Sequence, residues 1–317
     1  MMKKLGIFFG LVMVIMVLSG SGSTMSAVEK AEFNVASYNL RQLNDGDTKA
    51  GNGWSRRCPV LGQLIRYHEF DIFGTQEGFK SQLEELKALL PGYDYIGAGR
   101  EDGKDAGEHS AIFYDTEKFK LLDHGDFWIS ETPDKPGLGW DAVCPRICSW
   151  GKFRHKESGR EFVMFNLHMD HVGKTARVEG AKLVRSRIDG FGKGCPAFVT
   201  GDFNVDQTSP SYRTITAGGD LLDSYEVARL RYALNGTFNN YGPDGYTDSR
   251  IDHVFVTPGV KVLKYGVLTD TYRTPENSKR VNATNAPEEI EVSRYVARTP
   301  SDHFPVVVRV SLDRNNN

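Results

Sequence analysis

Hydrophobic residues alternate with polar ones in some segments of the chain and recur at helical spacing in others, so both strands and helices are predicted. Strands are expected where apolar residues alternate or form short runs between turn residues. The predicted strands are 33–39, 71–77, 93–99, 110–115, 119–130, 147–155, 160–170, 195–204, 250–257 and 304–312. The predicted helices are 58–70, 81–90, 175–191 and a short one at 209–215.

The order of these elements predicts the fold class. Strands outnumber helices, and both halves of the chain show a strand, a helix and a second strand that ends in an acidic cluster. This order predicts an α/β fold with two mixed sheets packed face to face and helices outside them. Ser81 is expected to cap the second helix, and the polar segment 274–291 is expected to be a loop. No linker divides residues 28–317, which are expected to form one domain.

The first 27 residues have the pattern of a secretory signal peptide. Lys3 and Lys4 precede an apolar run at 5–18, and small residues follow it. The run is shorter than the ~20 residues that a membrane-spanning helix needs. We therefore expect cleavage, export to the periplasm or the extracellular space, and no stable membrane span afterwards.

Composition narrows the classes of function. The hydrophobic content of 39%, the charged content of 25% and the formal net charge of -2 are typical of a soluble globular protein. They lack the basic excess of a protein that binds duplex nucleic acid through electrostatic attraction. Four cysteines are few for this length and lack zinc-site spacing, so buried thiols are favoured, although their pairing stays open.

Polar residues gather where predicted strands end. A single acid or histidine at such a place is more often an ordinary turn residue. Here six strand ends carry carboxylates, amides or imidazoles, which is more than turn chemistry alone explains. The residues are Asn39, Glu77, His168, Asp170, Asp202, Asn204, Asp252, His253, Asp302 and His303.

The motifs around these residues also occur in a family-specific order. SYNLR, TQEG, NLHMDH, GDFNVD, RIDHVFV and SDHFPV follow one another between residues 33 and 312. In this the chain resembles the endonuclease/exonuclease/phosphatase superfamily of deoxyribonuclease I-like, metal-dependent phosphoesterases. The resemblance implies a four-layer α/β sandwich and hydrolysis of a phosphate ester. The chain is expected to be a monomer.

Phosphate-ester hydrolysis needs a hard cation on the substrate, and the resemblance implies where it binds. Glu77 is the best single ligand, Asn39 offers a neutral oxygen beside it, and the family pattern adds Asp302. Such oxygen ligands suit Mg²⁺ or Mn²⁺.

The same resemblance implies the catalytic roles. His303 would be the base that activates water, oriented by Asp252. Asp202 would orient the water or hold a second metal, and Asn204 would donate to a phosphate oxygen. His168 would be a second hydrogen-bond donor or an acid.

Further residues are predicted to bind substrate. Trp54 with Arg56 and Arg57 would stack on a ring or bind phosphate, and the alternative is a packing tryptophan beside two solvated charges. The set also includes Arg41, Asp170, His171 and Arg177. For Arg177, a helix-surface charge is the alternative, and Asp47 is expected to be a turn residue.

The leading function is therefore a secreted, divalent-metal-dependent phosphoesterase that acts on a phosphodiester or a phosphomonoester. His168 replaces the tyrosine of abasic-site endonucleases, and Thr200 and Asp206 depart from the inositol 5-phosphatase pattern. An extracellular deoxyribonuclease I-like nuclease is one alternative, so nucleic acid is a possible substrate but not the favoured one. A non-catalytic binding domain of the same fold is the other.

Overall fold

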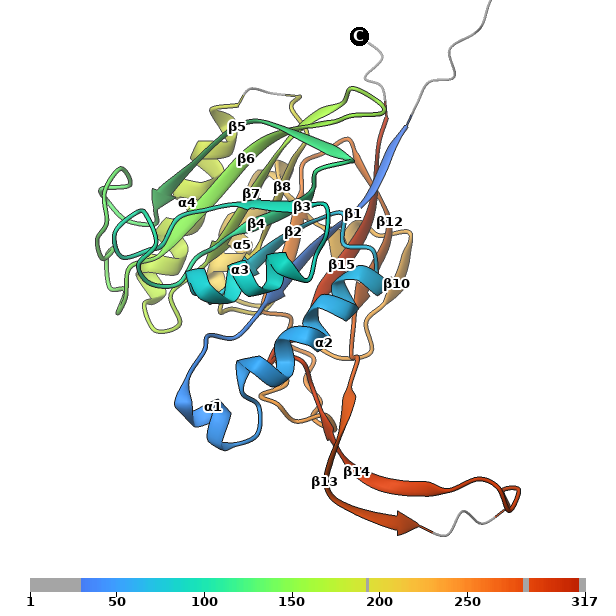
Figure 1. The fold of residues 1–317 in the computed structure, drawn as a ribbon. Helices are drawn as coiled ribbons and strands as arrows, with labels where there is room; N and C mark the ends of the chain where they lie inside the picture. Colours follow the sequence, from blue (N-terminus) through green and yellow to red (C-terminus); the bar gives the residue numbers. More distant parts are fainter. Residues whose placement is uncertain (1–29, 192–193, 282–284, 314–317) are drawn as a thin grey trace, which may run out of the picture.

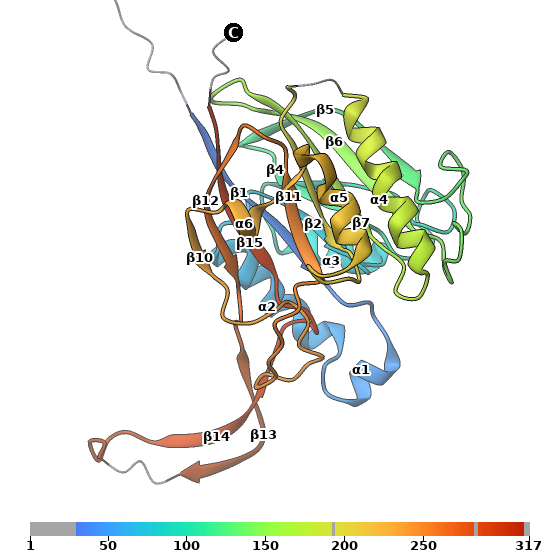
Figure 2. The same ribbon diagram turned by 180° about the vertical axis from the view of Figure 1, so that it is seen from behind.

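Two mixed β-sheets pack face to face in the computed structural model, with helices on both outer faces (Figures 1 and 2). The structure describes residues 30–191, 194–281 and 285–313. The arrangement is the predicted four-layer α/β sandwich. Its outer layers and its centre hold three separate hydrophobic clusters.

The first sheet has seven strands in the order β10-β12-β15-β1-β2-β4-β3. At its centre β1 runs parallel to β2 and antiparallel to β15. The parallel pair brings Asn39, at the end of β1, beside the end of β2, which Glu77 follows. The strands are β1 Ala31–Asn39, β2 Ile72–Gln76, β3 Tyr93–Ile96, β4 Ile112–Asp115, β10 Leu230–Tyr232, β12 Val260–Val267 and β15 Val306–Leu312.

The second sheet has six strands in the order β5-β6-β7-β8-β11-β9. The parallel pairing of β7 with β8 sets His168 beside Asp202, and the antiparallel pairing of β8 with β11 sets Asp202 beside Asp252. Three of the predicted site residues therefore form one row across neighbouring strands. The strands are β5 Phe119–Trp128, β6 Ile147–His155, β7 Glu161–His168, β8 Ala197–Asp202, β9 Leu222–Asp223 and β11 Asp252–Val256.

Helices cover the outer face of each sheet. In Figure 1, α2 (Trp54–Tyr67) and α3 (Lys80–Ala88) lie over the first sheet, and Figure 2 shows α4 (Lys174–Asp189) and α5 (Pro210–Thr216) over the second. Their apolar residues join the two outer hydrophobic clusters. Three shorter helical segments lie at Asp45–Lys49 (α1), Ala217–Gly219 (η1) and Ser224–Val227 (α6).

Aliphatic side chains and a group of aromatic rings fill the space between the sheets. Phe33 of the first sheet stacks on Phe162 of the second with ring centroids 5.1 Å apart. A polar network also joins the sheets: Asn166 accepts a hydrogen bond from Gln76 Nε2 at 2.7 Å and one from Thr200 Oγ1 at 2.9 Å. Because buried polar groups are costly when unpaired, this network fixes how the two sheets meet.

Several local predictions were wrong. Segment 274–291 is a loop only at residues 285–291 of its described part, because residues 274–281 belong to β13 (Tyr272–Val281), which pairs with β14 (Val292–Arg298) as a hairpin that projects from the body (Figure 1). The exposed start of β14 gives no one-sided apolar pattern to reveal it. Ser81 lies inside α3, and the N-cap is Phe79, whose backbone N–H donates to Gln82 Oε1.

The predicted signal peptide at residues 1–27 lies outside the described residues. Within the described part of the chain, no helix is long and apolar enough to cross a membrane. Cys58, Cys144, Cys148 and Cys195 are all free thiols.

Candidate functional site

A polar cleft of about 650 Å³ lies where the ends of the central strands of both sheets meet. Most of its lining residues carry charged, imidazole or amide side chains, and Phe238 and Tyr241 are aromatic lining residues. The lining residues with charged, imidazole or amide side chains are Arg41, Gln42, Asp47, Glu77, Arg100, Glu108, Arg146, His168, His171, Asp202, Asn204, Asn240, Asp302 and His303.

Three of these residues that follow central strands have left-handed backbone conformations. The φ angles are 57° at Arg41, 64° at Glu77 and 50° at Asn204. Positive φ is uncommon outside glycine, and such conformations cluster at functional sites. Each residue lies just after a central strand, so the strained turn directs its side chain into the cleft instead of along the sheet.

Carboxylates from both sheets form one end of the cleft. Asn39 joins them, because its Nδ2 donates to Glu77 Oε1 and to Asp202 Oδ2, each at 3.0 Å. Asp302 lies 3.6 Å from the Arg41 guanidinium, which is also 4.0 Å from Glu77, and the charge of the buried Arg57 acts on Asp302 as well. Burial and the Glu77 charge raise the pKa of Asp302. This excess of hard oxygen donors over cations fits Mg²⁺ or Mn²⁺.

A histidine-carboxylate pair lies next to these acids. His303 Nδ1 is 2.8 Å from Asp252 Oδ2, and His303 Nε2 is 3.7 Å from Asp202 Oδ2. Burial alone would lower the pKa of His303, but the carboxylates of Asp252 and Asp202 raise it above its ordinary value. The ring of Phe238 packs edge-on against the imidazole, with centroids 5.1 Å apart.

A second histidine-carboxylate pair lies on the other side of Asp202. His168 Nε2 is 3.5 Å from Asp202 Oδ2 and accepts a hydrogen bond from Asn204 Nδ2 at 3.0 Å. His168 Nδ1 is 3.8 Å from Glu108 Oε2. Burial, together with the nearby Arg146 and Arg100 guanidiniums, lowers the pKa of His168. The two imidazoles that flank Asp202 are thus shifted toward opposite charge states, an arrangement suited to acid-base chemistry.

Glu108 and Asp47 are functional-site residues that the sequence reasoning missed. Glu108 lies in the loop before β4, and its pKa is raised by burial. Asp47 was expected to be a turn residue, but it lines the cleft and binds Arg41 Nε at 2.9 Å. Neither lies at a strand end, so the pattern that found the other acids could not reveal them.

Two predicted substrate contacts lie elsewhere. Trp54 is buried against the α2 and α3 core, where its Nε1 donates to Glu85 Oε2 at 2.8 Å, so the packing alternative holds. Arg56 is exposed outside the cleft lining and donates to Gly51 O at 3.1 Å. The same alternative made Arg57 a solvated charge, and that part was wrong, because Arg57 is fully buried.

Asp170 and Arg177 hold the loop beside the cleft together. Asp170 is buried and accepts hydrogen bonds from the backbone N–H groups of Val172 and Gly173. Arg177 Nη1 donates to the Asp170 carbonyl at 2.8 Å, and neither side chain lines the cleft. Their predicted direct contact with substrate is therefore not supported, whereas His171 does line the cleft.

The fold and the acid-imidazole site define a phosphoesterase. Residues 36–303 match the model of the Endonuclease/Exonuclease/phosphatase family, and the chain belongs to this family. Its members are typically dependent on a divalent metal.

Solved structures from Bacteroides thetaiotaomicron are similar to this chain. A protein described by the same family name is 56% identical, with 90% of this chain and 97% of that chain covered and a TM-score of 0.84. A mannosyl-6-phosphatase is 58% identical, with 88% and 99% covered and a TM-score of 0.81. Nocturnin of Drosophila melanogaster is 26% identical, with 89% of this chain but 46% of that protein covered.

Proposed function

We propose that the protein is an exported phosphatase that hydrolyses a sugar phosphomonoester with the help of Mg²⁺ or Mn²⁺. The observation that carries the catalytic part is the position of Asp202 between the Nε2 atoms of His168 and His303, beside the Glu77 and Asp302 carboxylates. The mannosyl-6-phosphatase at 58% identity supports a monoester on a sugar.

In this mechanism His303 Nε2 accepts a proton from the attacking water. Asp252 holds the ring through Nδ1, so Nε2 faces the cleft, and Nε2 takes the proton when the ring is in its neutral form. Asp202 orients the water, because its Oδ2 lies within 3.7 Å of His303 Nε2. The new bond forms between the water oxygen and phosphorus, the bond from phosphorus to the sugar oxygen breaks, and the sugar oxygen takes a proton from solvent water and leaves as a hydroxyl.

The opposite side of the cleft stabilises the charge that this step creates. Asn204 Nδ2 donates to His168 Nε2 and to the Met169 carbonyl, so in this proposal the substrate displaces the first of these bonds: Asn204 then donates to a phosphoryl oxygen, and the freed His168 Nε2 faces the leaving-group oxygen. Asn39, Glu77 and Asp302 would hold the cation, which when bound supplies charge neutralisation at the phosphate. The proposed mechanism therefore uses residues at or just after strand ends of both sheets.

A substrate panel tests this proposal. Purified protein lacking residues 1–27 is assayed with mannose 6-phosphate, 4-nitrophenyl phosphate, bis(4-nitrophenyl) phosphate and duplex DNA, with Mg²⁺, with Mn²⁺ and with chelator. We expect metal-dependent turnover of the monoesters that His303→Ala abolishes. Preferred cleavage of DNA would favour the nuclease alternative, and turnover of no substrate would favour the binding-domain alternative.

Export has its own test. The full chain is expressed in a bacterial host, and the N-terminus of the protein in the periplasmic or medium fraction is sequenced. We expect it to begin near residue 28. An intact Met1 on protein found only in the cytoplasm would contradict export.

A further inference from the structure

Two guanidiniums besides that of Arg41 line the cleft, those of Arg146 and Arg100, and the mechanism above uses neither. We propose that Arg146 and Arg100 form an anion subsite that binds the non-bridging oxygens of a phosphomonoester and makes the cleft prefer monoesters to diesters. This inference rests on the proposed phosphatase function and deepens it.

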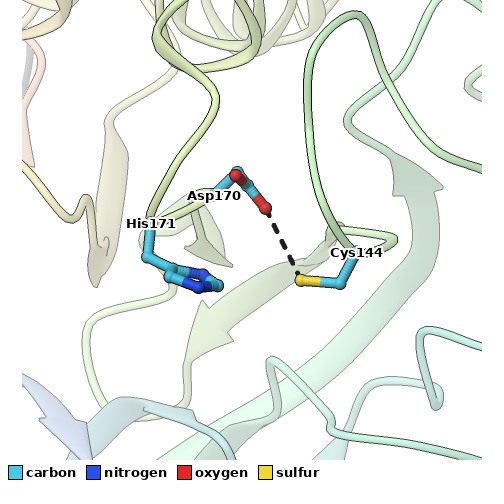
Figure 3. Close-up of side chains that lie close together, drawn as sticks. All are labelled: Cys144, Asp170 and His171. Atoms are coloured by element: carbon cyan, nitrogen blue, oxygen red, sulfur yellow. Dashed lines mark hydrogen bonds between the residues drawn. The ribbon is translucent and has the colours of Figure 1, made fainter.

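The residues around Arg146 first suggest a different site. Cys144, Asp170 and His171 offer sulfur, oxygen and nitrogen atoms within 4.8 Å of one another, a donor set typical of zinc. Figure 3 shows the Asp170 carboxylate directed at the Cys144 thiol, with the His171 ring on the same side. However, burial raises the pKa of the Cys144 thiol, which disfavours the thiolate that a metal needs.

The Arg146 guanidinium already supplies a positive charge to this cluster. Arg146 Nε lies 3.4 Å from Asp170 Oδ2, and Arg146 Nη2 lies 3.0 Å from His171 Nδ1. Both contacts belong to one rigid, planar group, so they fix its orientation. The cluster therefore positions a guanidinium, and it is not a metal centre.

One nitrogen of the Arg146 guanidinium remains available to bind a ligand in the cleft. Two of its three guanidinium nitrogens contact Asp170 and His171, while Nη1 has no hydrogen-bond partner among the residues that the structure describes. It lines the same cleft as His168 and Glu108, and its charge acts to lower the pKa of both groups. A guanidinium fixed on one edge and open on the other is suited to bind a phosphate oxygen.

Arg100 is fixed in a comparable way. Its Nη1 donates to Glu108 Oε2 at 2.6 Å, and its backbone carbonyl accepts a hydrogen bond from Trp128 Nε1 at 2.7 Å. Its Nε is buried and has no partner within the described chain. A polar atom left unpaired next to a cleft is consistent with a ligand that completes it.

The charge of the substrate explains the expected preference. A monoester is largely a dianion near neutral pH and has three non-bridging oxygens, whereas a diester is a monoanion with two. Asn204 and the cation site account for contacts on one side of the phosphoryl group. The Arg146 and Arg100 guanidiniums supply donors for the third non-bridging oxygen, which in a diester carries a second alkyl group and no charge.

Phosphate binding gives a test that does not depend on catalysis. Calorimetric titration with inorganic phosphate compares wild type with Arg146→Gln, Arg146→Lys and Arg100→Gln, after thermal unfolding has shown that each variant is folded. We expect Arg146→Gln to weaken phosphate binding about tenfold or more and Arg146→Lys to restore part of the loss. The matched control is Arg56→Gln, which removes an exposed arginine outside the cleft and should bind like wild type.

Kinetics then address the preference for monoesters. We expect Arg146→Gln to lower kcat/KM for 4-nitrophenyl phosphate at least about tenfold, mainly through KM, and to change that for bis(4-nitrophenyl) phosphate less than about threefold. Unchanged phosphate affinity in Arg146→Gln, or equal losses for both esters, would overturn the inference. If the wild type hydrolyses no monoester, the proposed function fails, and the phosphate titration still decides whether the arginines bind an anion.

Discussion

His303 Nδ1 lies 2.8 Å from Asp252 Oδ2, and both side chains are buried, so the carboxylate fixes which ring nitrogen faces the cleft. An asparagine at 252 keeps the shape but removes the charge that supports proton uptake at Nε2. We expect Asp252→Asn to lower kcat about 100-fold or more with a smaller change in KM. Steady-state kinetics on the monoester check this, with His303→Ala for comparison. A loss below fivefold in a folded Asp252→Asn protein would contradict the pairing.

Glu108 should affect the reaction through His168. The 3.8 Å separation of Glu108 Oε2 from His168 Nδ1 makes Glu108 a positioning residue for that imidazole. We expect Glu108→Gln to lower kcat about tenfold, because glutamine keeps the size but loses the charge. Glu108→Asp should recover part of the activity if position matters. If the Glu108→Gln protein is fully active, Glu108 only holds the Arg100 loop and does not position His168.

Metal binding can be measured without turnover. A cation that binds the folded state stabilises it, so Mg²⁺ or Mn²⁺ should raise the Tm of the wild-type protein. We expect Glu77→Gln to reduce this rise strongly and to require at least about tenfold more cation for half-maximal activity. Glu85→Gln is the control, because Glu85 binds Trp54 away from the cleft. An equal Tm rise in the Glu77→Gln protein would exclude Glu77 as a ligand.

The sequence predicted the layers of the fold because both sheets have a buried core with strong periodicity. It also predicted which strands deliver Asn39, Glu77, His168 and Asp202, since strand ends are marked by the change from apolar to polar residues. The β13 and β14 hairpin escaped prediction, because the beginning of β14 is exposed and bears no alternating pattern.

Residues that act from loops or from the starts of strands were harder to predict. Arg146 directly precedes β6, and Glu108 lies in a glycine-rich loop before β4, so no pattern along the chain sets either residue beside His168. For Trp54 and Arg57 the prediction erred in the other direction, because it gave a binding role to residues that are buried. Their residue types suggested phosphate or ring binding, but α2 begins at Trp54 and turns both side chains inward.

Arg57 joins three segments beneath the site. Its guanidinium donates to the carbonyl oxygens of Leu40 at 2.7 Å, Asn52 at 2.7 Å and Pro300 at 3.0 Å. Removing this guanidinium leaves several buried carbonyl oxygens without a hydrogen-bond donor. Each unpaired oxygen costs on the order of 1 kcal/mol or more. We expect Arg57→Ala to lower the free energy of unfolding by about 3 kcal/mol or more, measured by urea denaturation. Arg56→Ala, on the same helix, should change it by less than about 0.5 kcal/mol.

Asp170 gives a prediction for the dependence of stability on pH. Burial opposes its ionisation, but hydrogen bonds from the Gly173 and Val172 backbone and the Arg146 guanidinium lower the pKa of Asp170 from 3.8 to about 2. A carboxyl group whose pKa is lower in the folded state stabilises the protein above the unfolded pKa, and this stabilisation is lost as the pH falls toward the folded pKa.

Asp170→Asn should therefore be less stable than wild type by roughly 2 kcal/mol near pH 7. The difference should shrink as the pH falls below about 4 and be roughly halved near pH 3, where wild-type Asp170 begins to lose its advantage over the unfolded chain. Urea unfolding of both proteins at pH 7, 5, 4 and 3 measures it. Asp220→Asn, a change at an exposed carboxylate, controls for general charge effects, and a stability gap that stays constant or widens toward pH 3 would show that Asp170 is not held as a buried anion.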